Sequence, residues 1–293
     1  MSETTPFECV LDARASLGEG PVWSLVERVL YWVDINAPSL NRFDPVSGHN
    51  TTLPMPESIG CFALRRAGGF VAALRSGVWH LDADAHPQRK IAAAPYDQAT
   101  HRFNDGRCDP QGRFWPGTMN ERHDGASAVL MRLDGDDRLT PMVEGVTISN
   151  GLAWSPDGRT MYHADTPSQT IRAYDFDPAE GSITNGRVFF RFTADADRPD
   201  GAAVDSDGCY WVALYNAGAV VRFAPDGRLL ARYELAAKCP TMCAFGGADL
   251  RMLYVTTARQ RLSDDELARL PHSGGIFAMR VATPGLPEPF YVG

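Results

Sequence analysis

Cys108-Asp-Pro-Gln-Gly-Arg-Phe-Trp115 is a turn followed by an aromatic strand, and the chain repeats this unit. The two clearest further copies are Trp154-Ser-Pro-Asp-Gly-Arg-Thr-Met-Tyr162 and Val204-Asp-Ser-Asp-Gly-Cys-Tyr-Trp211. Looser copies run over residues 23–32, 64–71 and 245–254. The last residue of each copy recurs after roughly 40 to 50 residues, which is the period of a four-stranded propeller blade.

A second strand pattern closes each unit. Leu130-Met-Arg-Leu-Asp134 and Ile171-Arg-Ala-Tyr-Asp175 alternate apolar and polar residues before a turn, and residues 40–45, 78–82, 220–225 and 275–279 do the same. Such alternation is typical of half-buried strands, and the Asp-Pro or Pro-Asp-Gly pieces that follow are typical of hairpin turns. Six copies fill nearly the whole chain. The sequence therefore predicts an all-β fold, a single six-bladed β-propeller domain over residues 1–293.

Both chain ends and one insert carry further structural signals. Phe7-Glu-Cys-Val-Leu11 and Pro289-Phe-Tyr-Val292 have the composition of strands. Pairing the N-terminal segment into the last blade would close the ring and cover a sheet edge. Ser263-Asp-Asp-Glu266 has the spacing of a capping box, which predicts a short surface helix ending before Pro271 in the sixth blade.

Composition and charge argue against several classes of protein. The net charge of −8 and the lack of basic clusters beyond Arg65-Arg66 argue against nucleic-acid binding. No segment has the roughly 18 apolar residues that span a bilayer, and the N-terminus lacks the features of a signal peptide. We therefore expect a cytoplasmic protein without a membrane partner, and nothing indicates an obligate protein partner. The six scattered cysteines are expected to be free thiols.

Common catalytic motifs are missing from the sequence. It has no Gly-x-Ser-x-Gly elbow, no His-Glu-x-x-His motif, no phosphate-binding Gly-rich loop and no dinucleotide fingerprint. This argues against a serine-nucleophile hydrolase. His80 and His163 lie in strand-like runs, where a single histidine is more often packed than catalytic.

One position of the repeat concentrates polar side chains. Counting back four residues from each inner-strand start gives Glu19, Gly60, Asn104, Asn150, Asp200 and Thr241. In a ring these equivalent positions converge at one mouth of the central channel, ahead of the innermost strands. Four of them carry carboxylate or amide oxygens, which suit a hard divalent cation. Pairs such as Asn150-Gly151 are also common turn dipeptides, so ordinary turn chemistry remains the alternative.

Six short segments occur in a fixed order over almost the full chain. They are Leu17-Gly-Glu-Gly-Pro-Val-Trp23, Arg102-Phe-Asn-Asp-Gly106, Gly117-Thr-Met119, Ile148-Ser-Asn-Gly-Leu152, Pro199-Asp-Gly201 and Ser273-Gly-Gly-Ile-Phe277. Together they resemble the SMP-30/gluconolactonase family of regucalcin-like sugar lactonases. The combination of the segments is specific, whereas each segment alone is a weak signal.

The resemblance implies a set of site residues. Glu19, Asn150 and Asp200 match the family's metal ligands, the set that the repeat count also selects. Arg102 and Asn104 match residues that hold the sugar hydroxyls and the water beside the metal. Glu121 is a candidate substrate contact, although its spacing from Asn104 is one residue short of that expected. The alternative for Glu121 is an exposed loop residue next to Arg122.

The implied activity is hydrolysis of a sugar aldonolactone to the aldonic acid, as part of carbohydrate metabolism. Pentono- or hexonolactones such as arabinono-, xylono- or gluconolactone are the expected small-molecule substrates. One divalent metal ion would act as a Lewis acid on the lactone carbonyl, and either Asp200 or a hydroxide on the metal would serve as base. Ca²⁺ is the first choice for this oxygen-rich set, and Zn²⁺, Mn²⁺, Mg²⁺ and Fe²⁺ are compatible with it.

Two other functions remain open at this point. The same propeller scaffold could carry a metal-dependent hydrolase of other esters or phosphotriesters. It could also be a non-catalytic propeller that binds metal.

Overall fold

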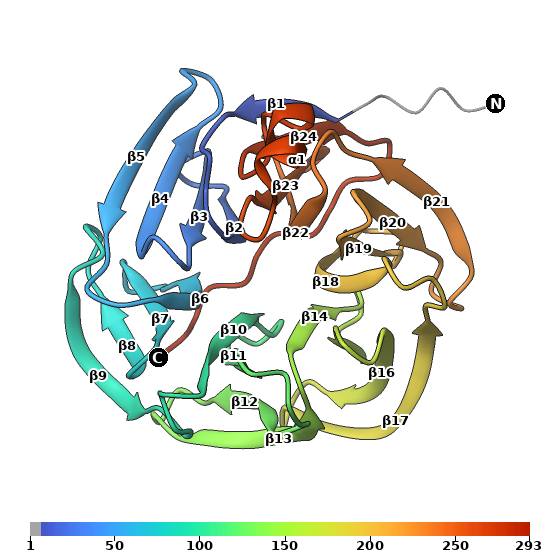
Figure 1. Ribbon diagram of the computed structural model, residues 1–293. Helices are drawn as coiled ribbons and strands as arrows, with labels where there is room; N and C mark the ends of the chain where they lie inside the picture. Colours follow the sequence, from blue (N-terminus) through green and yellow to red (C-terminus); the bar gives the residue numbers. More distant parts are fainter. Residues whose placement is uncertain (1–6) are drawn as a thin grey trace.

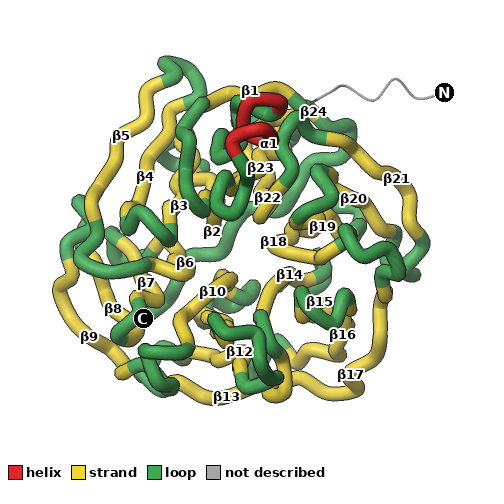
Figure 2. Tube along the Cα trace, in the orientation of Figure 1, coloured by secondary structure: helices red, strands yellow, loops and turns green. Residues whose placement is uncertain are grey.

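The computed structural model describes residues 7–293, and in that range the backbone forms six four-stranded antiparallel sheets around a central axis (Figure 1). In five of the sheets the four strands follow each other in chain order, and the sixth recruits its fourth strand from the N-terminus. Strand and loop account for nearly all of the described trace (Figure 2). The predicted all-β, six-bladed β-propeller is therefore confirmed.

Each blade contributes one strand to each of four concentric layers. The innermost strands are β2 (Gly18–Ser24), β6 (Ile59–Leu64), β10 (His101–Cys108), β14 (Ser149–Trp154), β18 (Arg198–Val204) and β22 (Cys239–Gly246). The second strands are β3 (Val29–Asp34), β7 (Phe70–Leu74), β11 (Phe114–Asn120), β15 (Thr160–Asp165), β19 (Tyr210–Tyr215) and β23 (Met252–Ala258). The third strands are β4 (Ser39–Asp44), β8 (Gly77–Leu81), β12 (Ala128–Leu133), β16 (Thr170–Asp177), β20 (Ala219–Phe223) and β24 (Ile276–Arg280). The outer strands are β5 (His49–Pro54), β9 (Pro87–Ala93), β13 (Leu139–Val146), β17 (Ser182–Arg191), β21 (Leu229–Glu234) and β1 (Glu8–Leu11).

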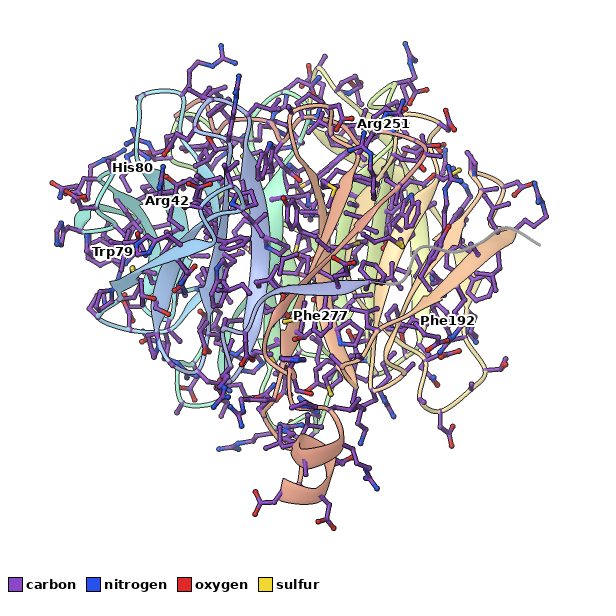
Figure 3. All side chains as sticks on the ribbon, turned by 90° about the horizontal axis from the view of Figure 1, so that it is seen from above. Arg42, Trp79, His80, Phe192, Arg251 and Phe277 are labelled. Carbon is purple, nitrogen blue, oxygen red and sulfur yellow. The ribbon has the colours of Figure 1, made fainter. Side chains whose placement is uncertain are left out.

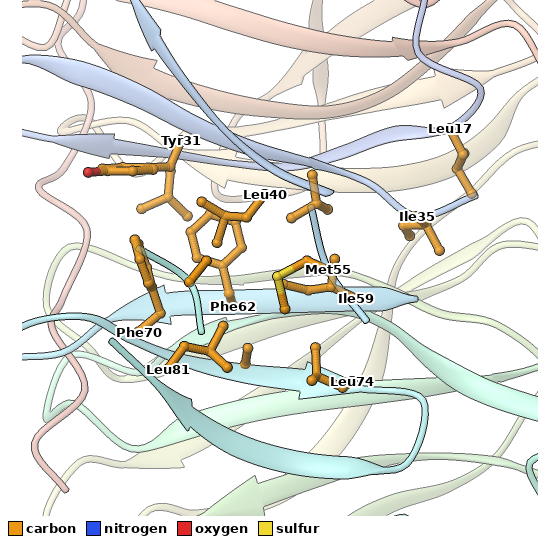
Figure 4. Close-up of a cluster of buried hydrophobic side chains, with 14 of the residues drawn as sticks. Leu17, Tyr31, Ile35, Leu40, Met55, Ile59, Phe62, Phe70, Leu74 and Leu81 are labelled. Carbon is orange, nitrogen blue, oxygen red and sulfur yellow. The ribbon is translucent and has the colours of Figure 1, made fainter. Parts of the chain in front are cut away.

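Apolar side chains fill the space between neighbouring blades. Figure 4 shows the cluster between the first and second blades, in which Tyr31, Phe62 and Phe70 are buried. The rings of Tyr31 and Phe62 meet the ring of Phe70 edge-on, at centroid distances of 5.3 and 5.8 Å. Edge-to-face pairs add stability beyond the area that they bury, so the pair of Tyr31 and Phe70 helps to hold the first blade against the second.

The N-terminal strand closes the ring as predicted. β1 pairs antiparallel with β24 and becomes the outer strand of the sixth blade, which is otherwise built from the last part of the chain. This pairing covers a sheet edge and ties the two ends of the propeller together.

The C-terminal segment departs from the sequence prediction. Residues 289–292 do not form a strand, although Tyr291 is fully buried and makes one isolated parallel bridge with Arg65. Pro287 and Pro289 lack the N–H groups that a ladder needs. The segment instead crosses the channel in Figure 1, and a Glu288 oxygen lies 3.4 Å from the Arg107 guanidinium.

The insert of the sixth blade contains α1 (Asp264–Arg269), the helix predicted from the capping box. The Ser263 hydroxyl accepts from the Glu266 backbone N–H, and the Glu266 carboxylate accepts from the Ser263 N–H. Figure 3 shows this helix projecting from one face of the propeller. Among the described residues, no helix is long and apolar enough to cross a membrane.

Candidate metal and substrate site

All six innermost strands have a pairing irregularity near their start. The register shifts fall between Glu19 and Val22, Ile59 and Cys61, Phe103 and Gly106, Asn150 and Ala153, Pro199 and Ala202, and Pro240 and Met242. A β-bulge re-aims the side chains around it and bends the strand. The equivalent positions therefore lie inside the innermost strands, at the bulges, and not ahead of the strands as the sequence suggested. The ladder simply resumes on both sides of each bulge.

The residues chosen from sequence come together in one cavity. Glu19, Arg102, Asn104, Glu121, Asn150 and Asp200 all line a cavity of about 420 Å³. The four residues at repeat positions are between 3% and 6% exposed. This buried polar group at the channel mouth is a far more specific arrangement than six separate turns would give.

The two remaining repeat positions contribute no cavity oxygen. A side chain at Gly60 would place its Cβ only 2.4 Å from the Phe103 carbonyl carbon, so the neighbouring strand leaves room for glycine alone. The Thr241 hydroxyl is buried and bonded to Gly18 O and Thr256 Oγ1. The four oxygen-bearing positions are therefore those of the first, third, fourth and fifth blades.

Asn150 is held by hydrogen bonds at both ends of its amide. Its Nδ2 donates to Thr166 Oγ1 at 2.7 Å, and its Oδ1 accepts from Asn104 Nδ2 at 2.9 Å. The second Nδ2 hydrogen of Asn104 goes to the Ser149 carbonyl at 3.1 Å. The Asn150 oxygen keeps a further lone pair available for a cation.

Arg102 is fixed by the same network. Its Nη1 donates to Phe103 O and to Asn104 Oδ1, both at 2.8 Å. Its Nε lies 3.7 Å from a Glu121 oxygen, and Glu121 also accepts two 2.8 Å hydrogen bonds from Arg75 Nη2. Within residues 7–293 the Nη2 group of Arg102 has no protein hydrogen-bond partner, so it remains for a ligand in the cavity.

The ionised forms of the two carboxylates of the site, Glu19 and Asp200, are disfavoured when no cation is bound. Burial and the nearby Asp105 together raise the pKa of Glu19 to about 8, against smaller lowering by the Gly20 N–H and Arg102. Burial, Glu19 and Asp105 raise the pKa of Asp200 well above its ordinary range. Buried like charges that repel each other are typical of functional sites, because a bound cation relieves the repulsion.

The donor set fits a hard cation of moderate size. Among the described residues, no three His, Cys, Asp or Glu side chains gather as a metal site. The candidate set combines the Glu19 and Asp200 carboxylates with the Asn150 amide oxygen, all at one channel mouth. Three oxygen donors suit Ca²⁺ or a similar ion that keeps further positions for water or substrate.

Other side chains belong to the site that the sequence did not single out. Asp105 is buried beside Arg102-Phe-Asn104, and its Oδ1 has no hydrogen-bond partner. Thr166 orients Asn150. The cavity wall also includes His123, Arg198 and Arg261. Asp105 lies inside a segment quoted from the sequence and Arg198 directly precedes another, so proximity to these motifs was the available signal. Thr166 and Arg261 lie in irregular segments without a repeat pattern.

Comparison with known proteins agrees with the fold and shows the family. The family model of the SMP-30/Gluconolactonase/LRE-like region matches residues 17–259. The 6-deoxy-6-sulfogluconolactonase of Pseudomonas putida is 47% identical over 295 residues, covering 100% of both chains. Human regucalcin is 36% identical over 279 residues, covering 92% of this chain and 93% of its own. The crystal structure of a calcium-binding regucalcin from Agrobacterium tumefaciens superimposes with a TM-score of 0.94 at 29% identity, covering 99% of each chain.

The chain therefore belongs to the SMP-30/gluconolactonase family, as its sequence segments indicated. This confirms the expectation of a lactonase-family hydrolase, a class of enzymes that act on ester bonds. All six cysteines, which lie within the described range, are free thiols as expected.

Proposed function

We propose that this protein is a metal-dependent sugar lactonase that opens an aldonolactone to the aldonic acid. The observation that carries the proposal is the pair of buried carboxylates, Glu19 and Asp200, at one mouth of the channel with the Asn150 amide. Membership in the lactonase family supports the same activity.

Glu19, Asn150 and Asp200 would hold the ion. When bound, a divalent ion at this position supplies Lewis-acid polarisation of the lactone carbonyl. Ca²⁺ is our first choice because the donors are all oxygens, and the likeness to a calcium-binding regucalcin supports it. The cavity of about 420 Å³ beside these residues leaves space for the substrate carbonyl and for a water molecule.

Asp200 is the proposed general base. Water adds to the carbonyl carbon of the lactone while Asp200 accepts one of its protons, and the ring C–O bond then breaks. The proton passes to the ring oxygen, which becomes a hydroxyl group of the aldonic acid. Burial, Glu19 and Asp105 raise the pKa of Asp200 in the metal-free protein, and a bound cation would lower it again. The carboxylate would then be ionised, and its oxygen not committed to the ion would accept the proton.

Arg102 would position the substrate. Arg102 lines the cavity, and its Nη2 has no hydrogen-bond partner among the described residues, whereas its Nη1 is committed to Phe103 and Asn104. A guanidinium fixed in this way can donate to two hydroxyl oxygens of a sugar ring without a large loss of side-chain entropy. Asn104 uses both amide hydrogens inside the protein, so it offers substrate only an oxygen lone pair.

The proposed substrates are pentono- and hexonolactones, including arabinono-, xylono- and gluconolactone. The relative from Pseudomonas putida is named for a sulfonated gluconolactone, so that compound belongs in the same panel. The cavity of about 420 Å³ falls within the roughly 300–1,000 Å³ typical of small-molecule sites.

The test is a pH-indicator assay of ring opening on chelator-stripped protein, with Ca²⁺, Mg²⁺, Mn²⁺, Zn²⁺ and Fe²⁺ added back singly. We expect one or more of these metals to restore lactone hydrolysis, and Asp200→Asn to reduce kcat at least a hundredfold while the circular dichroism spectrum is unchanged. Asp226→Asn, in an exposed hairpin turn, is the matched control and should behave as wild type. Turnover of phosphotriesters or simple esters without any lactone turnover would overturn the proposal.

A further inference from the structure

Three basic side chains on the cavity wall have no part in the proposed hydrolysis. They are His123 in the loop after β11, Arg198 at the start of β18, and Arg261 between β23 and α1. Unlike the buried Glu19, Asn150 and Asp200, they are partly or fully exposed, so they form the outer part of the cavity. Three separate blades supply them, and the ring geometry brings them to one cavity.

The positive charges of this outer part act on one another. Burial lowers the pKa of His123, and the guanidinium groups of Arg261, Arg102 and Arg198 lower it further. All three arginines therefore lie close enough to the imidazole to disfavour a further positive charge there. In a chain of net charge −8, such a concentration of positive charge is an unusual local feature.

The two outer arginines lack the partners that the inner arginines have. Glu121 accepts hydrogen bonds from Arg75 and lies against Arg102. Within residues 7–293, neither Arg198 nor Arg261 forms an ion pair or donates a side-chain hydrogen bond to the protein. Their donors are thus directed to solvent or to a ligand.

Arg198 and Arg261 do not serve to neutralise the buried carboxylates of Glu19 and Asp200. Arg102 is the guanidinium that lowers the pKa of both Glu19 and Asp200, whereas Arg261 and Arg198 act on His123. The cavity therefore has an inner acidic zone and an outer basic zone. Arg102 acts on both zones, which places it between them.

We propose that His123, Arg198 and Arg261 form a subsite for an anionic group at the end of the lactone farthest from its carbonyl. This rests on the proposed function, since the carbonyl is taken to lie beside Glu19 and Asp200. The group is a tetrahedral or planar oxyanion, meaning a terminal sulfonate, phosphate or carboxylate. The planar fork of arginine matches all three by paired hydrogen bonds.

The test compares kcat/KM for unsubstituted glucono-δ-lactone with that for its 6-sulfonate, 6-phosphate and 6-carboxylate counterparts. We expect at least one anionic lactone to be preferred by roughly 10- to 100-fold, the range for hydrogen bonds to a charged group. The member of the series that is preferred most identifies the anion. The double variant Arg198→Gln/Arg261→Gln should reduce the preference at least tenfold, and raised ionic strength should reduce it too.

Arg251→Gln is the matched control, because Arg251 lies on the face opposite α1 (Figure 3). It should keep the wild-type preference. Equal kcat/KM for neutral and anionic lactones in the wild type would overturn the subsite while leaving the lactonase proposal intact. A preference that persists in the double variant would also overturn it.

A binding measurement separates the subsite from the reaction. Calorimetric titration with gluconate and 6-phosphogluconate, the ring-opened acids, needs no turnover. Tighter binding of 6-phosphogluconate by about tenfold or more, lost in the double variant, would support the subsite even if no lactone were hydrolysed. Equal binding of the two acids, together with equal binding of gluconate carrying a 6-sulfonate, would overturn it.

Discussion

Thr166 determines the orientation of the Asn150 amide. The Thr166 hydroxyl donates to the Pro199 carbonyl at 2.7 Å, and a carbonyl can only accept. The same hydroxyl oxygen must therefore accept from Asn150, so the group 2.7 Å away is the Nδ2 and not the Oδ1. One threonine thus presents the oxygen of a candidate metal ligand to the channel and also joins the fourth blade to β18 of the fifth.

Thr166→Val should weaken metal binding without removing any proposed ligand. The isosteric valine leaves Asn150 Nδ2 without an acceptor and frees the amide to rotate. Loss of such an orienting partner typically costs about 10- to 100-fold in metal affinity. Thr166→Ser keeps the hydroxyl and should bind metal nearly as the wild type does. Isothermal titration of the chelator-stripped proteins measures both, and equal affinity in the valine variant would show that Thr166 does not control the site.

Removal of the metal should lower the melting temperature. Glu19 and Asp200 are buried close to each other, and without a cation their mutual repulsion opposes folding. A ligand that binds only the folded state adds about 2.7 kcal/mol at a hundred times its Kd, which corresponds to several degrees in a protein of this size. Calorimetric scans with chelator and with added Ca²⁺ measure the shift.

Asp200→Asn is the informative variant for this stability effect. It removes one of the two repelling carboxylates, so the metal-free variant should melt at or above the metal-free wild type. Added Ca²⁺ should then raise its melting temperature much less than it raises that of the wild type. A wild-type melting temperature that stays constant from chelator to millimolar Ca²⁺ would rule out a stabilising metal at this position.

The sequence was sufficient to predict the inner three strands of each blade. The second strands carry aromatic anchors such as Trp115 and Trp211, which are fully or almost fully buried between blades and belong to a unit that recurs after roughly 40 to 50 residues. The outer strands have no comparable pattern, because both β5 and β9 lie largely at the surface and can hold residues such as Asn50 and Lys90. Strand pairing with the third strand, and not side-chain burial, determines these outer segments.

The site residues that occupy equivalent positions of the repeat could be predicted from the repeat in the sequence, and the others could not be predicted from it. Glu19, Asn150 and Asp200 occupy equivalent bulges, so their convergence follows from the ring. Asp105 has the appearance of a turn residue in Asn104-Asp105-Gly106, and only the tertiary structure reveals that its carboxylate is buried. Arg261 comes from an insert that has no counterpart in the other blades, so no pattern in the sequence could locate it.

His163 should make the protein sensitive to mild acid. Burial, with a smaller effect of Arg172, lowers the pKa of His163 from its usual value of 6.5 to about 4. Between these two values the unfolded chain binds a proton that the folded chain does not. The contribution of His163 to the free energy of unfolding is therefore fully present above pH 6.5 and is lost as the pH falls toward 4. The loss is about 3 kcal/mol for this residue.

Urea unfolding between pH 4 and 7 measures this effect. His163→Gln should flatten the dependence of unfolding free energy on pH in this window, whatever its effect on the absolute stability. His49→Gln is the matched control, since His49 is exposed on β5. An unchanged slope in the His163 variant would mean that other groups cause the acid sensitivity.

Substitution of Gly151 tests whether the bulge beside Asn150 depends on the positive φ of this glycine. Its φ of +63° is unfavourable for any residue with a Cβ, and a Cβ there would lie 2.5 Å from Tyr210 Oη and 2.8 Å from Ala164 Cβ. Tyr210 also donates a 2.7 Å hydrogen bond to the Gly151 carbonyl, so the tyrosine has little freedom to move away. Gly151→Ala combines the backbone cost of about 1–2 kcal/mol with about 1–3 kcal/mol for overpacking.

Gly48→Ala separates these two contributions. Gly48 has a φ of +72° in the turn between β4 and β5, and a Cβ there would meet nothing within 4 Å. It should therefore lose only the backbone contribution, about 1–2 kcal/mol. Gly151→Ala should lose about twice as much in urea unfolding and should also weaken metal binding, because Asn150 is the preceding residue. Equal losses in the two variants would mean that the contact between Gly151 and Tyr210 relaxes freely, and that the bulge does not hold Asn150 in place.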